Sequence, residues 1–189
     1  MCGLSVAAII LAAGESTRLG RAKQDVVLGT ETLLERAVRV ATEAGLSPVV
    51  VVVREARYID ELQKRGATVL LNRKAYEGMA SSIRCGVKWA KGVEASGAVV
   101  MTCDQPGVRA EHLRALAADA NMRTGSEYGG HVGVPAYFPA ADFELLLGLE
   151  GDAGARELLQ GARSIPQKDL IVDIDTEEDF RAAQILFEK

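Results

Sequence analysis

A glycine-rich segment near the N-terminus, Gly14-Glu-Ser-Thr-Arg-Leu-Gly20, has the composition of a phosphate-binding loop. It directly follows an apolar run, so we expect it at the carboxyl end of a buried strand. Glycine lets a phosphate approach the backbone closely, and the free N–H groups of such a loop bind phosphate oxygens. Arg18 and Lys23 add two cations, which suit a polyphosphate.

This segment differs from two common nucleotide-binding signatures. It lacks the terminal Gly-Lys-Ser/Thr of a P-loop, and it does not match the G-x-G-x-x-G pattern of dinucleotide-binding folds. Its residues alone therefore leave two interpretations open: a phosphate loop, and an ordinary strand-to-helix turn with solvated charges.

Carboxylates follow two other expected strands. Asp104 comes directly after the run 98–102, in Thr-Cys-Asp-Gln-Pro, where Pro106 would fix the turn. Asp173 and Asp175 flank Ile174, and residues two apart on an extended strand face the same side. Oxygen ligands of this kind suit Mg²⁺, which bridges to substrate phosphates. The alternatives are a turn aspartate at 104 and a helix-capping role for Asp175.

Alternating strand and helix patterns position these groups. We predict strands at 6–11, 49–53, 68–71 and 98–102, with helices at 32–44, 54–65, 79–90 and 110–122 between and after them. Four such repeats indicate a parallel sheet covered by helices on both faces. The rhythm then changes, and we predict a strand at 134–138, helical segments at 145–147 and 153–159, a strand at 171–174 and a final helix at 176–187.

Length and composition limit the class of protein. The 189 residues carry a net charge of −4, with 48% hydrophobic and 25% charged residues, which excludes a disordered chain, a collagen and a coiled coil. The acidic balance argues against general nucleic-acid binding. No apolar run reaches the roughly 18 residues of a membrane span, and no signal peptide is evident. Three widely spaced cysteines predict free thiols in the cytoplasm.

At this point the chain resembles a known family. The segment LAAGESTRLGRAK is similar to the signature LAAGxSxRxGxxK of the MobA-like nucleotidyltransferases, which transfer a nucleoside monophosphate from an NTP to a phosphorylated acceptor. The resemblance implies a three-layer α/β/α sandwich, Rossmann-like, with a mostly parallel sheet of the nucleotide-diphospho-sugar transferase type. It also implies nucleotide binding by Leu11, Ala12, Ala13, Gly14, Arg18 and Lys23.

Further segments extend the resemblance from Val6 to Phe180. NRKAYEGMASS resembles Nx₃WxxGMxxS, which implies that Gly78, Ser81 and Ser82 contact the nucleotide; ordinary helix capping by the serines is the alternative. The resemblance implies that Asp104 and Asp173 bind the metal, although Asp175 also remains a candidate. The segments GGHVGVPAYF and GDAGAR imply an acceptor site that contains Gly130, His131, Gly133, Asp152 and Arg156.

The resemblance implies one nucleotidyltransferase domain over residues 1–189, with Arg18, Lys23 and Asp104 as catalytic residues and Mg²⁺ as cofactor. The Asp-Gln-Pro, GVPAYF and GDAGAR elements are most similar to the branch that includes molybdenum cofactor cytidylyltransferase, which implies CMP transfer from CTP to a molybdopterin-type acceptor. The GMASS element, where the guanylyl branch has GPLAG, favours CTP over GTP.

Other functions remain open from the sequence. They are nucleotidyl transfer to a sugar phosphate or another phosphorylated acceptor, guanylyl transfer to molybdopterin, and a non-catalytic nucleotide-binding partner of a molybdoenzyme or its maturation factor. Outside the motifs, His131 could bond an acceptor phosphate or lie exposed in its loop. His112 is expected at the surface.

Overall fold

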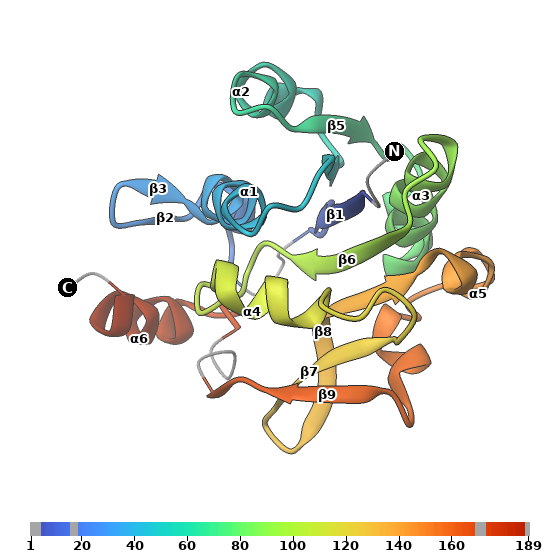
Figure 1. Ribbon diagram of the computed structural model, residues 1–189. Helices are drawn as coiled ribbons and strands as arrows, with labels where there is room; N and C mark the ends of the chain where they lie inside the picture. The colour runs from blue at the N-terminus through green and yellow to red at the C-terminus, as the bar shows by residue number, and fades with distance from the viewer. Residues whose placement is uncertain (1–4, 16–18, 169–172, 188–189) are drawn as a thin grey trace.

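The computed structural model describes residues 5–15, 19–168 and 173–187. Its largest element is a seven-stranded mixed sheet in the order β5-β4-β1-β6-β8-β7-β9 (Figure 1). The strands span β1 Val6–Ala12, β4 Val49–Val53, β5 Thr68–Leu71, β6 Gly97–Thr102, β7 Thr124–Tyr128, β8 His131–Pro139 and β9 Arg163–Pro166. Within the described part of the chain, β8 is the one strand that runs against the other six. The prediction of a mostly parallel sheet is therefore confirmed.

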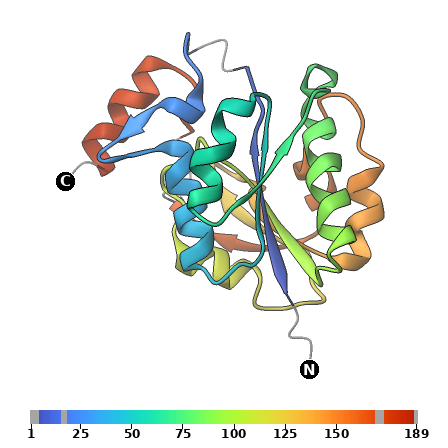
Figure 2. The ribbon, with the colours of Figure 1, turned by 90° about the horizontal axis from the view of Figure 1, so that it is seen from above.

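Helices cover both faces of this sheet, as Figure 2 shows edge-on. Successive side chains of β1 point to opposite faces, so Ala8 and Ile10 enter one apolar core while Ala7 and Ile9 enter the other. The first face carries helices α1 (Leu33–Glu43), α2 (Ile59–Lys64) and α4 (Ala110–Leu116). The second carries α3 (Met79–Gly92) and α5 (Phe143–Leu147). The central strands are buried on both faces, which is why β4 is an unbroken run of valines.

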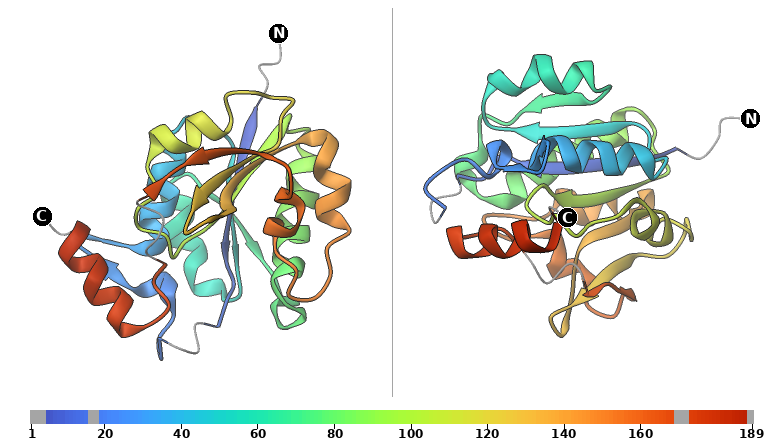
Figure 3. Two further views of the ribbon diagram at one scale, coloured as in Figure 1. Left: turned by 90° about the horizontal axis from the view of Figure 1, so that it is seen from below. Right: turned by 90° about the vertical axis from the view of Figure 1, so that its left-hand side faces the viewer.

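A small third cluster attaches the last helix. Helix α6 (Glu177–Phe187) packs beside the hairpin of β2 (Val27–Leu28) and β3 (Glu31–Thr32), apart from the main sheet (Figure 3). Its N-terminus has a reciprocal cap, because the Asp179 amide donates to Thr176 Oγ1 at 3.2 Å and the Thr176 amide donates to Asp179 Oδ2 at 2.8 Å. This helix follows Asp173 and Asp175 directly, so its docking positions both carboxylates.

Four predicted elements are wrong in extent or kind. The helix expected at 110–122 ends at Leu116, because the Asp119 side chain accepts from the Asn121 amide and forms a turn instead. The helix expected at 54–65 begins only at Ile59, after a 3-10 turn, and the segment expected at 153–159 is a 3-10 turn over Ala155–Leu159. The strand expected at 171–174 falls partly outside the described residues, and Asp173 and Ile174 are not in a strand.

Two expectations about side chains can also be checked. His112 is buried, not at the surface, because it turns inward and its Nε2 lies 2.7 Å from Ser126 Oγ on β7. The two described cysteines, Cys85 and Cys103, are free thiols as predicted. Within the described residues, no helix has the length and apolar character needed to cross a membrane.

Candidate active site

A cleft of about 720 Å³ opens at the carboxyl ends of β1 and β6. These two strands are neighbours at the point where the order of the parallel strands reverses, which is where open α/β sheets bind ligands. Ten of the residues expected from the sequence to form the site line this cleft. They are Leu11, Ala12, Ala13, Gly14, Lys23, Gly78, Ser82, Asp104, Asp152 and Asp173. Arg18 lies outside the described residues.

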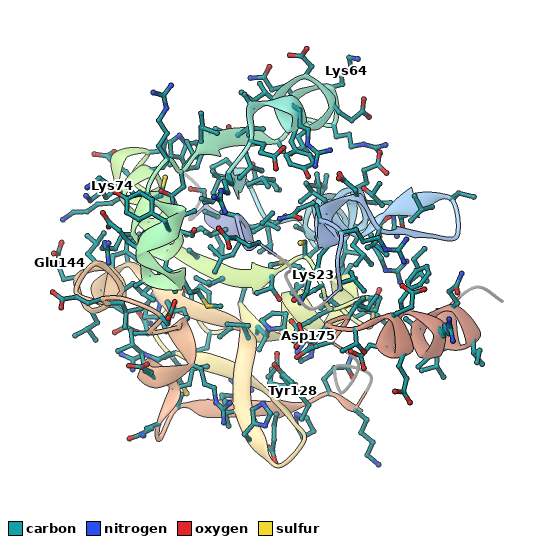
Figure 4. All side chains as sticks on the ribbon, turned by 180° about the vertical axis from the view of Figure 1, so that it is seen from behind. Lys23, Lys64, Lys74, Tyr128, Glu144 and Asp175 are labelled. Carbon is teal, nitrogen blue, oxygen red and sulfur yellow. The ribbon has the colours of Figure 1, made fainter. Side chains whose placement is uncertain are left out.

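Lys23 forms ion pairs with two carboxylates in the cleft. Its Nζ donates to Asp104 Oδ2 at 2.8 Å and also donates to Asp175 Oδ1. Figure 4 shows Lys23 and Asp175 next to each other, with Tyr128 nearby. Burial alone would lower the pKa of Lys23, but the charges and hydrogen bonds of Asp104 and Asp175 outweigh it and raise that pKa. Lys23 is therefore a fixed ammonium group held between two carboxylates.

Asp173 completes the acidic side of the cleft. Loss of hydration raises the pKa of Asp173 to about 6, and repulsion from Asp104 and Asp175 adds to the shift, while Gln105 and Lys23 act against it. Between the two aspartates, the Ile174 amide donates to the backbone oxygen of Asp104 at 3.0 Å. This bond ties the C-terminal segment, which carries Asp173 and Asp175, to the end of β6, which carries Asp104.

The donor set of this cleft fits a magnesium ion bound together with a phosphorylated substrate. Mg²⁺ commonly takes one or two carboxylates from the protein and its remaining ligands from phosphates and water. Across the described ranges, no group of three or more His, Cys, Asp or Glu side chains is close enough to form a complete protein cage for a metal. Burial raises the pKa of Asp173 most, and repulsion from Asp104 and Asp175 raises it further, so a cation bound here would favour the charged form of Asp173.

The start of α3 forms the wall opposite the carboxylates. Ser82 lines the cleft, whereas Ser81 does not: it is buried, and its Oγ donates to the backbone oxygen of Gly78 at 2.9 Å. Asn72 donates to both serine hydroxyls, at 2.9 and 3.0 Å. Nucleotide contact by Ser81 remains a prediction. The capping alternative does not hold for either serine, because the N-cap position of α3 is Gly78 and no side chain caps it.

Gly78 holds two loops against each other at this wall. Its φ is +101°, and a Cβ there would lie 2.3 Å from the oxygen of Gly151 and 2.6 Å from Asp152 Oδ1. Asp152 does not cap the helical segment expected at 153–159, because the 3-10 turn there begins at Ala155 with no side-chain cap. Asp152 instead reaches the cleft because the 151–152 loop packs on Gly78.

The Gly78→Ala substitution should therefore destabilise the protein by about 2–3 kcal/mol, through both the left-handed φ and the collision with the 151–152 loop. Urea denaturation measures this change. Gly92→Ala is the matched control, because a Cβ at the end of the same helix meets nothing within 4 Å. Equal midpoints for the two variants would contradict the packing described for Gly78.

The expected acceptor loop is a tight hairpin turn that lies outside the cleft lining. Gly129 and Gly130 have φ values of +56° and +77° and join β7 to β8. The His131 ring packs on Tyr128 with centroids 4.8 Å apart, and its Nδ1 lies 3.3 Å from the oxygen of Gly129. Among the residues that line the cleft, Gly130, His131, Gly133 and Arg156 do not appear. Contact between these four residues and an acceptor remains a prediction.

Tyr128 and Gln105 line the cleft, although neither was among the expected site residues. Gln105 Nε2 donates to Tyr128 Oη at 3.0 Å, while Tyr128 Oη donates to the backbone oxygen of Val134 at 2.9 Å. A Cβ at Gly133 would lie 3.0 Å from Tyr128 Oη, so that glycine leaves room for the tyrosine. The Gly-Gly pair itself could have predicted a hairpin here, because such pairs are typical of two-residue turns.

The fold and the cleft together define a nucleotide-binding α/β protein of the nucleotidyltransferase type. Residues 8–168 match the family model of the MobA-like NTP transferase domain. The chain belongs to this family, and the expectation drawn from the LAAGESTRLGRAK segment is confirmed.

Individual relatives agree with this assignment. The purine catabolism protein PucB of Bacillus subtilis is 32% identical in an alignment of 190 positions, which covers 91% of this chain and 92% of that protein. A probable molybdenum cofactor guanylyltransferase of Opitutus terrae is 33% identical over 106 residues, 56% of this chain and 51% of that protein.

Solved structures share the fold. The crystal structure of Rv0371c from Mycobacterium tuberculosis is 26% identical, with a TM-score of 0.80 over 96% of this chain and 98% of that one. A structure of Rv0371c in complex with manganese has a TM-score of 0.77 at 24% identity, over 96% and 98% of the two chains. At 24% identity, the similarity to the manganese complex shows a shared fold and no more.

Proposed function

We propose that this protein transfers CMP from CTP to a molybdopterin-type molybdenum cofactor and releases pyrophosphate. The observation that carries the proposal is the charge arrangement of the cleft, in which Lys23 lies between Asp104 and Asp175 beside the glycine-rich loop. A triphosphate needs such a cationic loop, and the divalent ion that accompanies it needs such carboxylates. We take residues 1–189 to act as one domain in this reaction.

The residues of the chain would act mainly by positioning. The loop that begins at Gly14 would bind the triphosphate, and a Cβ at Gly14 would meet no atom within 4 Å, so its backbone is accessible. Lys23, together with Arg18, would stabilise the negative charge that develops as the bond to pyrophosphate breaks. The attacking phosphate oxygen of the acceptor is already charged at neutral pH, so the reaction requires no general base.

Asp104 and Asp173 would hold Mg²⁺, with Asp175 as the alternative second ligand. When bound, the ion would neutralise the α-phosphate and the leaving pyrophosphate. The complex of the similar protein Rv0371c with manganese supports a divalent ion in this fold. Since Lys23 contacts Asp104 and Asp175 directly, it would also keep these carboxylates in place before the substrate arrives.

The choice of base and acceptor depends on finer features. The GMASS element at the start of α3 supports cytidine, whereas the similarity to a guanylyltransferase supports guanosine as the competing base. The Asp-Gln-Pro, GVPAYF and GDAGAR elements support a molybdopterin-type acceptor, and PucB is named for purine catabolism. These considerations favour CTP and molybdopterin, with a molybdoenzyme or its maturation factor as the recipient of the product.

A pyrophosphate-release assay with Mg²⁺ tests this proposal. We expect release with CTP only when molybdenum cofactor is present, and a lower rate with GTP. Faster turnover with GTP would assign the protein to guanylyl transfer. Turnover with a sugar phosphate in place of molybdopterin would overturn the acceptor, and tight NTP binding without any release would indicate a non-catalytic binding protein.

A further inference from the structure

The side chain of Gln24 is buried against the glycine-rich loop, next to Lys23. Only 6% of the residue is exposed, yet it is one of the residues at the cleft. Its Nε2 donates to the backbone oxygen of Ala12 and lies 3.4 Å from the oxygen of Gly14.

Only one end of the Gln24 amide is satisfied. Among the described residues, Gln24 Oε1 is buried and has no hydrogen-bond partner. Exchanging the two ends of the amide would point Oε1 at the carbonyl oxygens of Ala12 and Gly14, so the loop itself fixes the orientation. A buried acceptor without a partner weakens folding, and a residue that served only packing would not need it.

We propose that Gln24 is a positioning residue that sets the peptide planes of the phosphate loop. In a planar trans peptide the C=O and N–H groups point in opposite directions. By binding the oxygens of Ala12 and Gly14, Gln24 turns the N–H groups of Ala13 and Glu15 the other way and keeps carbonyl oxygens from facing an anion. Ala13, Gly14 and Glu15 all line the cleft, so those N–H groups are available to phosphate oxygens.

This inference rests on the triphosphate site of the proposed function, but it does not depend on the base or the acceptor. The probe is therefore inorganic tripolyphosphate with Mg²⁺, and calorimetric titration measures its dissociation constant. We expect Gln24→Met, which keeps the shape of the side chain and removes the donor, to weaken binding about tenfold. Gln24→Glu should weaken it further, because carboxylate oxygens would face the loop carbonyls. Binding of cytidine should change less than threefold in both variants.

The matched control is Ser126→Ala. This substitution also removes a buried hydrogen bond, from Ser126 Oγ to the oxygen of Pro135 at 2.6 Å, but it lies outside the cleft. We expect it to lower the melting temperature and leave tripolyphosphate affinity unchanged.

The other outcomes distinguish failure of the inference from failure of the proposed function. A Gln24→Met protein that binds tripolyphosphate as tightly as the wild type overturns the inference, as does a Gln24→Met protein that no longer folds, because the role of the residue would then be general stability. Absence of binding by the wild-type protein would overturn both the triphosphate site and the inference. If the Gln24 variants bind tripolyphosphate more weakly as expected, but the wild type transfers the nucleotide to a different acceptor, the inference stands and only the proposed function is overturned.

Discussion

The Lys23→Met variant is expected to release pyrophosphate on the order of 10²–10³ times more slowly than the wild type, because a preorganised charge at the reacting phosphate is lost. Lys23 holds Asp104 and Asp175 together in the structure, so the substitution also leaves these carboxylates without their ammonium partner. Single-turnover kinetics at saturating CTP and Mg²⁺ measure the effect on the chemical step.

The same variant should be less stable, and the loss should depend on pH in a defined direction. The loss in free energy of unfolding should be smaller than the value of about 3–5 kcal/mol that is typical when a fully buried ion pair loses one partner. The reason is that Lys23, Asp104 and Asp175 keep some contact with solvent. Asp173 already has its pKa raised to about 6, so the folded state binds more protons than the unfolded state between pH 4 and 6. Stability therefore rises as the pH falls through 6, and removal of Lys23 should enlarge this rise.

Two controls separate charge from structure in the Lys23 experiment. Lys23→Arg keeps the charge and should retain more activity than Lys23→Met. Arg21→Met removes a cation close by in sequence, but Arg21 is exposed, pairs with Glu177 and does not line the cleft. Equal rates for Arg21→Met and Lys23→Met would contradict the role given to Lys23.

The second large effect is expected for Asp104→Asn, which should abolish measurable turnover while the protein remains folded. The amide keeps the shape of the side chain and can still accept from Lys23, but it lacks the charge that a divalent ion requires. Pyrophosphate release across a Mg²⁺ titration measures this loss, and circular dichroism checks the fold.

Neighbouring carboxylates supply the comparison for Asp104. Asp60→Asn, on the exposed surface of α2, should leave the rate unchanged. The variants Asp173→Asn and Asp175→Asn should identify the second ligand. The variant that has lost the ligand should need more Mg²⁺ than the wild type to reach half of its maximal rate. Full activity of Asp104→Asn would show that the strand-end carboxylate does not hold the metal.

The nucleotide side of the cleft could be predicted from the sequence because its parts are continuous segments next to strand ends. Gly14 and Asp104 each follow a strongly apolar run directly, and the carboxyl ends of neighbouring parallel strands meet at one edge. Lys23 is placed by the short turn after the loop, and its position across from Asp175 depends on the docking of α6, which no local pattern reveals.

The acceptor side was harder to predict because it is built from an antiparallel hairpin. The glycines before β8 form a two-residue turn, and Tyr128 and Gln105, which were not among the expected site residues, line the cleft. Strand β9 was missed because Arg163–Pro166 has only four residues and half of them are polar. Strand β7 was missed because its residues lack a continuous apolar run. Pairing with β8, rather than local propensity, makes β7 a strand.

Crystals grown with CTP and manganese would show whether the cleft binds a divalent ion and a triphosphate together at Asp104 and Lys23. Manganese replaces magnesium at oxygen-rich sites and can be located by its anomalous scattering. We predict one strong anomalous peak in the cleft. It would mark an ion bound to the Asp104 carboxylate, to Asp173 or Asp175, and to phosphate oxygens of CTP that lies along the Gly14 loop. A nucleotide and metal bound away from Asp104 and Lys23, on any other surface of the protein, would contradict it.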